Sequence, residues 1–290
     1  MNKIGVYSWR DGREEFCVPL PNVFLSPIRI DILKFVNSNM SKNKRQAYSV
    51  NQSAGMNTSS ISWGTGRAVA RVPRVKGSGS NRSGQGAVAN SCRGGRMFSP
   101  TTIWRKWHHK IIKTQRSYAL STAIACSGLT SIVIARGHNI NKVPEIPLVL
   151  SSLAECHIST KSAKKTLINL GAYKDIVDKK IKRTIKAGKG KFRNRRYKNY
   201  LGPLIIHKDR IRNFRNMPGI DTSCVKHLSL QKMAPGGHVG RFCIWTVNAF
   251  RMIDSLFSKK MIHAMTDLKT IINSEYVQNR LKYSSKSIIY

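Results

Sequence analysis

Acidic residues are missing from one long stretch of this sequence. No Asp or Glu occurs between Asp31 and Glu145, a run of 113 residues that contains 18 Lys and Arg. A segment of one charge sign repels itself unless another molecule supplies the negative charge, and a phosphate backbone is the dense, regular candidate. The chain carries a net charge of +38 over 290 residues, and residues 179–198 add 11 Lys or Arg without an acid. The charge pattern therefore predicts binding to a nucleic acid.

Paired cysteines and long apolar runs are also missing. The six cysteines are scattered without a CxxC pair, which predicts reduced thiols rather than a disulfide framework or a zinc knuckle. The N-terminus shows no hydrophobic signal core. Only residues 118–135 are long enough to cross a membrane without a charge, and seven of them are Ser, Thr, Cys or Gly. We expect a buried helix there, a turn at Ser127 and Gly128, and then a buried strand.

Apolar periodicity predicts an α/β fold. Strands are expected at 4–7, 16–18, 132–135, 147–150, 204–207 and 242–246, and helices at 160–170, 174–186 and 247–258. Strands that alternate with helices indicate a mostly parallel sheet. A further helix is expected, with Ser26 as its cap, Pro27 as its first residue and an apolar face of Ile28, Ile32, Phe35 and Val36. Helical spacing is also present in Trp104, Trp107, Ile111 and Tyr118. We expect the three aromatic rings to pack in the fold rather than to stack on bases.

Between these regions, residues 42–110 lose both periodicities. Half of residues 77–96 are Gly or Ser, and Val88 is their one bulky aliphatic residue. Ordering some seventy residues costs on the order of 100 kcal/mol, at roughly 1–2 kcal/mol for each backbone. The sequence thus predicts a globular α/β domain of residues 1–41 and 111–258, an extended basic loop of 42–110 that RNA orders, and a basic helical C-terminal extension of 259–290.

Five motifs occur in a fixed order along the chain. They are WGTGRAVARVPRVKGSGSNRSGQG at 63–86, CRGGRMFSPTTIWRKWHHK at 92–110, AGKGKFRNRR at 187–196, FRNMPGI at 214–220 and APGGHVGRFCIWT at 234–246. Together they resemble the large-subunit ribosomal proteins of the universal L4 family, in its eukaryotic and archaeal branch, over about residues 2–290. Eukaryotic members usually continue into a long, very basic C-terminal tail, whereas this sequence stops at Tyr290.

The resemblance implies a three-layer α/β/α domain with a mostly parallel sheet. It also implies that the acid-free loop threads ribosomal RNA until its tip, near residues 64–82, lines the nascent-peptide exit tunnel. The tunnel-lining residues would be Gly64, Arg67, Arg71, Arg74 and Arg82, and the four arginines would also contact RNA. Further RNA contacts would be Lys76, Arg93, Arg96, Arg105 and Lys106 on the loop, and a second site of Lys189, Lys191, Arg193, Arg195 and Arg196.

On this interpretation the chain is a structural constituent of the large ribosomal subunit that binds and stabilises its RNA. The expected partners are large-subunit ribosomal RNA, neighbouring large-subunit ribosomal proteins and the nascent peptide, with no membrane, small-molecule substrate, cofactor or metal. The expected location is the cytoplasmic ribosome, with nuclear or nucleolar assembly in a eukaryote. The alternative is an rRNA-binding assembly factor or an RNA-processing enzyme, which would co-sediment only with precursor particles.

Motifs that an enzyme could use have simpler interpretations. Asp175 and Asp178 lie four residues before Lys179 and Lys182, a spacing that predicts ion pairs on a helix surface rather than a catalytic pair of carboxylates. Four other candidates are incomplete, and we expect no catalytic residue. His108 with His109 and Cys224 with His227 lack further ligands or a carboxylate. The run at 188–191 fails the Walker spacing, and the run at 236–240 is too short for a dinucleotide fingerprint.

Overall fold

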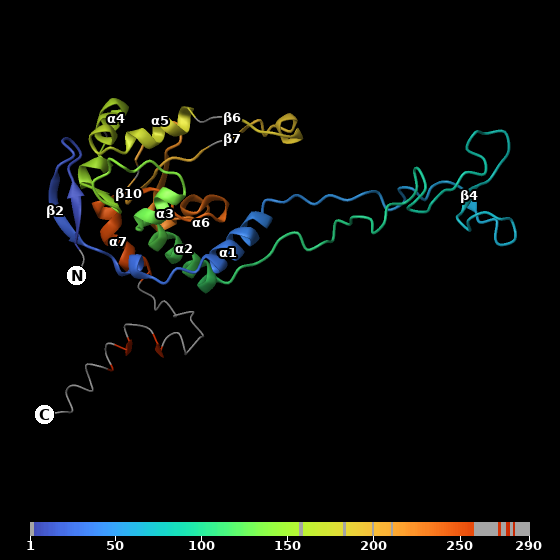
Figure 1. The fold of residues 1–290 in the computed structure, drawn as a ribbon, viewed down its shortest axis with the longest axis horizontal. Coiled ribbons are helices and arrows are strands. Elements are labelled where there is room, and N and C mark those ends of the chain that lie inside the picture. Colours follow the sequence, from blue (N-terminus) through green and yellow to red (C-terminus); the bar gives the residue numbers. More distant parts are fainter. Residues whose placement is uncertain are drawn as a thin grey trace. The chain divides into compact units, whose positions relative to one another are not determined.

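The predicted α/β architecture is present in a computed structural model of the chain, shown in Figure 1. The structure describes residues 3–156, 159–181, 184–198, 200–209, 211–257, 272–273, 277–278 and 281. The expected C-terminal extension, 259–290, therefore lies almost wholly outside the described residues. Two units can be separated: unit 1 comprises Met1–Ser38 and Ile111–Tyr290, and unit 2 comprises Asn39–Lys110.

Unit 1 is built on one mixed sheet of six strands. Their order is β2-β1-β5-β10-β8-β9, and every neighbouring pair is parallel except β1 with β2. The strands are β1 (Lys3–Tyr7), β2 (Glu14–Pro19), β5 (Leu148–Leu150), β8 (Leu204–His207), β9 (Asp221–Cys224) and β10 (Cys243–Thr246). The fold class expected from the sequence is confirmed.

Helices cover both faces of this sheet. In the described part of the chain they are α1 (Ile30–Lys42), α2 (Lys113–Ser127), α3 (Thr130–Ala135), α4 (Thr160–Asn169), α5 (Tyr173–Ile181), α6 (Leu230–Met233) and α7 (Val247–Phe257). Short 3-10 helices connect them: η1 (Asn22–Leu25), η2 (Ser152–Glu155), η3 (Lys189–Phe192), η4 (Val225–His227) and η5 (Pro235–Gly237).

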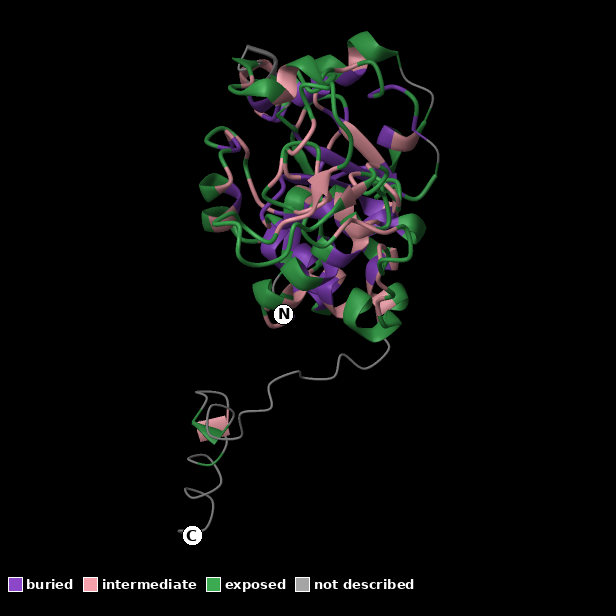
Figure 2. Ribbon diagram, turned by 90° about the vertical axis from the view of Figure 1, so that its right-hand side faces the viewer, coloured by how far each residue is buried: buried purple, intermediate pink, exposed green. Residues whose placement is uncertain are grey.

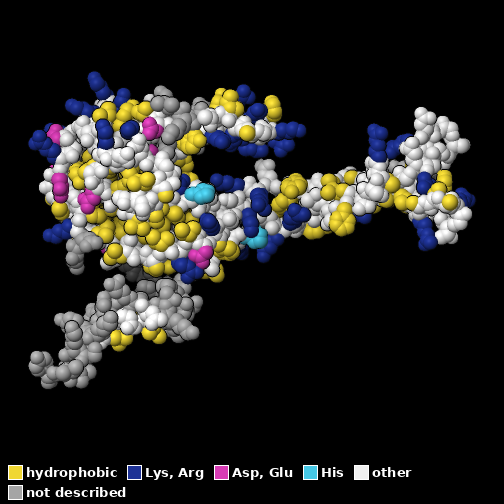
Figure 3. Space-filling model, in the orientation of Figure 1, with side chains coloured by type: hydrophobic (Ala, Val, Ile, Leu, Met, Phe, Trp, Pro, Cys, Tyr) yellow, Lys and Arg dark blue, Asp and Glu magenta, His cyan; other side chains and the backbone are white. Residues whose placement is uncertain are grey.

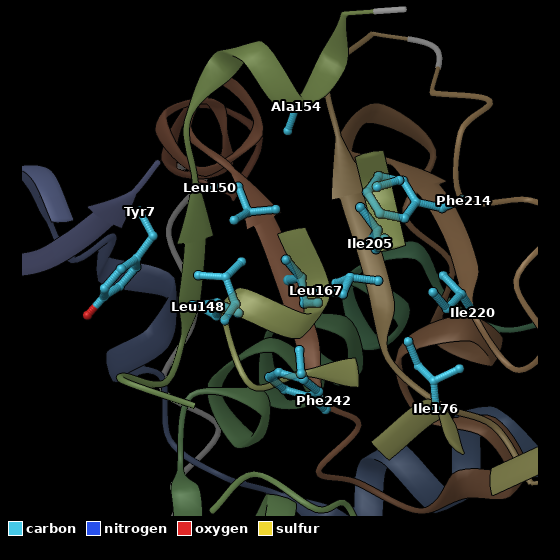
Figure 4. Close-up of a cluster of buried hydrophobic side chains, with 14 of the residues drawn as sticks. Tyr7, Leu148, Leu150, Ala154, Leu167, Ile176, Ile205, Phe214, Ile220 and Phe242 are labelled. Carbon is cyan, nitrogen blue, oxygen red and sulfur yellow. The ribbon is translucent and has the colours of Figure 1, made fainter. Parts of the chain in front are cut away.

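The core lies on either side of the strands because successive side chains point to opposite faces. On one face Leu148, Leu150, Ile205 and Ile244 pack with Leu167 of α4, in the cluster that Figure 4 shows. On the other face Trp245 meets the rings of Phe24 and Phe250, at centroid distances of 5.8 and 6.0 Å. Figure 2 marks the buried segments in purple, among helices and loops that are largely exposed.

The first helix begins later than the sequence predicts. Residues 22–25 form η1, Ser26 is extended with φ −63° and ψ 145°, and α1 starts at Ile30. The extended conformation of Ser26 is the one expected of a cap before a proline, but the helix begins three residues after Pro27. The predicted apolar face is correct at Val36, which is fully buried, but wrong at Ile28 and Phe35, which are 37% and 56% exposed. The unpredicted Leu33 is fully buried beside Val36.

The strand expected at 132–135 is instead helix α3. Backbone hydrogen bonds join Val133 N–H to Leu129 O at 3.2 Å and Arg136 N–H to Ile132 O at 3.1 Å. Only Val133 of the run is fully buried, and Ile134 is 54% exposed, which suits one helix face and not a buried strand. The β-branched composition was misleading here because tertiary position overrides strand propensity.

Two further helix predictions need correction. Helix α2 begins at Lys113, so the spacing of Trp104 and Trp107 does not reflect a helix, and Trp104 is 72% exposed instead of packed. The helix expected over 174–186 ends at Ile181 as α5, and Thr184–Ile185 forms strand β6. A basic run with a glycine at 188 favours a hairpin over a continued helix.

Candidate nucleic-acid interface

Unit 2 is organised around one short strand, β4 (Arg74–Val75). On one side it pairs antiparallel with β3 (Ser60–Ile61). On its other side Val75 exchanges backbone hydrogen bonds with Gln85 and Gly84, at 3.0 and 3.2 Å. Ala87 is the one buried hydrophobic residue among the described residues 39–110, so hydrogen bonds and not a core hold these strands together.

The same region stacks two of the predicted arginines on one ring. The guanidinium carbons of Arg67 and Arg74 lie 5.8 and 4.9 Å from the ring centroid of Trp63. Arg74 also donates from Nη1 to the carbonyl of Gly84 at 3.0 Å and is half-buried. Its Nε is buried without a hydrogen bond. Arg74 therefore stabilises the loop through its own hydrogen bond and ring contact, while Arg67 remains exposed.

The outgoing and returning strands of the loop also touch at two other points. Tyr48 and Trp107 lie with ring centroids 4.9 Å apart, and Arg105 lies over Trp107 at 5.6 Å. Nearer the tip, a Cβ on Gly55 would lie 2.4 Å from the backbone nitrogen of Arg96, so only glycine permits this approach. Non-covalent contacts between its own residues therefore hold the two strands of the loop together at several points. The sequence did not predict these contacts.

Cations are exposed along the loop. Arg71, Lys76, Arg82, Arg93 and Lys106 are exposed, as are Arg67 and Arg105, while Arg74 and Arg96 are half-buried. Figure 3 shows Lys and Arg spread over unit 2 without acidic side chains. Partial desolvation and the nearby Lys42, Lys106 and Arg45 lower the pKa of His109, so this imidazole is neutral at physiological pH.

The second basic run forms a hairpin. Strand β6 pairs antiparallel with β7 (Tyr197–Lys198), and Lys186 N–H donates to Arg196 O at 2.8 Å. The turn contains η3, and the carbonyl of Gly190 accepts from the backbone N–H groups of Arg193 and Arg195 at 3.1 and 3.3 Å. The turn therefore brings together all five residues predicted for this site: Lys191 is half-buried, and Lys189, Arg193, Arg195 and Arg196 are exposed.

Not every arginine is available to a ligand. Arg241 is 1% exposed, donates to the carbonyls of Gly202 and Lys232 at 3.2 and 2.7 Å, and meets Asp221 at 2.6 Å. Arg136 binds the carbonyls of Pro235, His238 and Val239, and burial lowers the pKa of its guanidinium. These two arginines join segments of the fold, and the sequence carries no signal that separates them from binding arginines.

Asp175 does not lie on the helix surface, where the sequence places it, and the side chains of the expected partners Lys179 and Lys182 lie outside the described residues. The Asp175 side chain is fully buried and accepts from His138 Nδ1 at 2.9 Å and from Asn139 N–H at 3.0 Å. Asp178 accepts from Asn139 Nδ2 at 3.0 Å. These carboxylates attach α5 to the segment after α3. The sequence did not predict this contact, because a single histidine at position 138 forms no recognisable motif with Asp175.

The remaining enzyme-like motifs are separated in the fold. Cys224 donates to the carbonyl of Lys208 at 3.2 Å and ends strand β9, while His227 is exposed. Gly240 lies against Ile132, whose carbonyl oxygen would be 2.5 Å from an added Cβ, so the glycines at 236–240 serve packing. Within the part of the chain that the structure describes, no cluster of three His, Cys, Asp or Glu side chains could hold a metal, and no helix could span a membrane.

An α/β domain with exposed, acid-free basic segments is typical of basic nucleic-acid-binding proteins. The described residues of this chain include no group of side chains arranged for catalysis. Residues 18–256 match the model of the ribosomal protein L4/L1 family. The chain belongs to this family. It is a ribosomal protein of the large subunit, and a structural protein rather than an enzyme.

Individual relatives agree with the family match. A protein of Prunus armeniaca named large ribosomal subunit protein uL4 is 50% identical, covering 90% of this chain and 69% of the relative. The protein of that name from Urechis caupo is 47% identical over 98% of this chain and 78% of its own length. Large ribosomal subunit protein uL4A of Schizosaccharomyces pombe is 42% identical, covering 98% of this chain and 83% of the relative. The resemblance seen in the sequence motifs is confirmed.

Proposed function

We propose that this chain binds and stabilises large-subunit ribosomal RNA through two basic segments, and that the tip of unit 2 lines the nascent-peptide exit tunnel. The observation that supports the proposal is that most positively charged side chains of these two segments are exposed to solvent. Most of the cations of unit 2 and of the hairpin 184–198 lie at the surface, where phosphates can reach them. Each neutralised phosphate releases counterions, so many such contacts add to a large affinity.

The tip assignment rests on shape and composition. Residues 64–82 are mostly exposed, and Gly64 and Gly66 hold φ values of 74° and 86° with no atom near an added Cβ. A backbone that turns tightly and presents arginines suits a wall of RNA and protein around a narrow passage. The neighbouring partners would be other large-subunit ribosomal proteins, and the place of action the cytoplasmic ribosome.

Deletion of residues 71–77 tests the tunnel assignment. The deletion removes β4, around which unit 2 is organised, and none of the deleted residues is buried. We expect large subunits that still contain the chain but lack density at the narrow part of the tunnel in a cryo-EM map. Their response to tunnel-binding drugs or stalling peptides should change. An unaltered constriction in that map would show that the tip lies elsewhere.

Co-sedimentation tests the ribosomal role itself. A structural constituent remains at one copy for each mature large subunit through a high-salt wash. An assembly factor or a processing enzyme would instead be found only on precursor particles, and that result would replace the proposed function.

A further inference from the structure

The hairpin 184–198 exposes a large aromatic side chain at its turn. Phe192 is 76% exposed and follows Lys191 at the end of η3. Full burial of such a side chain contributes roughly 1.5–3 kcal/mol of stabilisation. Because Phe192 is exposed, this stabilisation is available to a binding partner that covers the ring. Most isolated exposed hydrophobic residues need no explanation, but this ring lies among the five cations of the second basic site.

The turn holds Phe192 in a defined backbone conformation. The bonds from the N–H groups of Arg193 and Arg195 to Gly190 O close the turn directly after the ring. Gly188 and Asn194 adopt positive φ values of 80° and 58° on either side of it. Preorganisation of this kind lowers the conformational entropy that the backbone of the turn loses on binding.

Surrounding charge indicates the ligand. Residues 179–198 contain no acid, and the Nζ of Lys191 lies 5.7 Å from the Phe192 centroid. An apolar pocket on another ribosomal protein would have to accept five cations together with the ring. RNA accepts both, because phosphates take the cations while a base offers its flat face to the ring.

The geometry of RNA limits which bases are accessible. Bases inside an A-form duplex are stacked above and below, and the deep groove is too narrow for a hairpin turn. Bases in loops, bulges and strand ends are open to aromatic side chains. We therefore propose that Phe192 is a stacking platform for an unpaired base of large-subunit ribosomal RNA, with the flanking Lys191 and Arg193 on the adjacent phosphates.

This inference rests on the proposed RNA-binding function, and the salt dependence of binding separates the two. Loss of stacking should lower affinity without changing the slope of log affinity against log salt, because no phosphate contact is lost. Loss of an arginine should lower the slope by about 0.7–0.9. The experiment uses the full-length chain and deproteinised large-subunit ribosomal RNA as the probe, with binding measured at several salt concentrations.

Four variants are compared with the parent chain. Phe192→Ala and Phe192→Leu should each bind about 5- to 150-fold more weakly at an unchanged slope, the range expected for one lost stacking contact. Phe192→Tyr keeps an aromatic face and should retain parental affinity. Arg193→Ala is the electrostatic control and should flatten the slope. Thermal unfolding should coincide for all four, since each of these side chains is exposed.

Each outcome decides the matter. If Phe192→Leu binds as tightly as the parent, any apolar group suffices and stacking is refuted. If Phe192→Ala binds RNA normally but incorporates poorly into large subunits, the ring contacts a protein and the inference is overturned. If the parent chain shows no salt-dependent RNA binding, the proposed function fails before the question of Phe192 arises.

Discussion

At the scale of single residues, Arg241 shows that some cations of this basic protein stabilise the fold and do not bind a ligand. Its guanidinium joins β9, α6 and the segment before β8 through two carbonyls and Asp221. Replacement by Met fills similar volume but leaves these acceptors unpaired, so we expect the free energy of unfolding to fall by about 3 kcal/mol. The midpoint of urea denaturation measures this change.

The matched control for Arg241 is an exposed arginine of unit 1. Arg212 is exposed, and its replacement by Met should change the free energy of unfolding by less than about 0.5 kcal/mol. Equal midpoints for the two variants would contradict the structural role of Arg241.

Cysteine reactivity follows burial at the same scale. Burial raises the pKa of the Cys243 thiol to about 12 and that of Cys126 to about 11. The thiolate is the reactive form, so neither thiol should be alkylated by iodoacetamide at neutral pH until the protein unfolds. Cys156 is exposed and should react first, and Cys17 should follow more slowly because its bond to Glu14 raises its pKa. Peptide mass spectrometry after timed labelling gives the order, and early labelling of Cys243 would contradict it.

At the scale of elements, the two strands of the basic loop depend on one close approach. A side chain on Gly55 would collide with the backbone at Gly95 and Arg96, and the φ of Gly55 is 80°. We expect Gly55→Val to part the strands and to speed limited proteolysis within residues 42–110. The melting of unit 1 should not change, because Gly55 belongs to unit 2.

Asn57→Val introduces the same side chain at an exposed position two residues away and serves as the control. Its proteolysis should match that of the parent chain. If both variants are digested at the parental rate, the contact at Gly55 does not hold the strands together.

Sequence patterns predicted the sheet well and the loop poorly, for a physical reason. Buried strands such as β8 and β10 are short apolar runs whose burial is encoded locally, and both lie at their predicted positions. Helix α3 was mistaken for a strand because its β-branched residues favour strands, while its exposed Ile134 could not be known in advance. The Trp63 and Arg74 pair and the contact of Tyr48 with Trp107 join residues far apart in sequence, and no periodicity encodes such pairs. The positive charge of the candidate interface could therefore be predicted from the sequence, whereas the contacts that shape it could not.

At the scale of the whole molecule, affinity for ribosomal RNA should depend on how many phosphates the surface neutralises. Replacing Arg193, Arg195 and Arg196 together with Ala should reduce the slope of log affinity against log salt by about 2 to 3, at roughly 0.7–0.9 for each phosphate contact. The loss reflects fewer released counterions and leaves the fold intact, because all three side chains are exposed.

A double replacement of Arg10 and Arg13 with Ala is the control at this scale. These arginines adjoin Asp11, Glu14 and Glu15, so their charge is already balanced, and the slope should stay at the parental value. Equal flattening in both variants would mean that binding depends on net charge alone and not on the hairpin as a site.

The order of strands in the sheet also has a consequence for the timing of synthesis. β10 lies between β5 and β8, yet it is the last of the six strands to leave the translating ribosome. At about 5–20 residues per second, the chain from Leu150 to Thr246 takes on the order of 5 to 20 seconds to make. During that interval the sheet has a gap at its centre, with the inner edges of β5 and β8 open to other strands. The basic loop has been synthesised by then, so its cations are available to RNA while the domain is still unfinished.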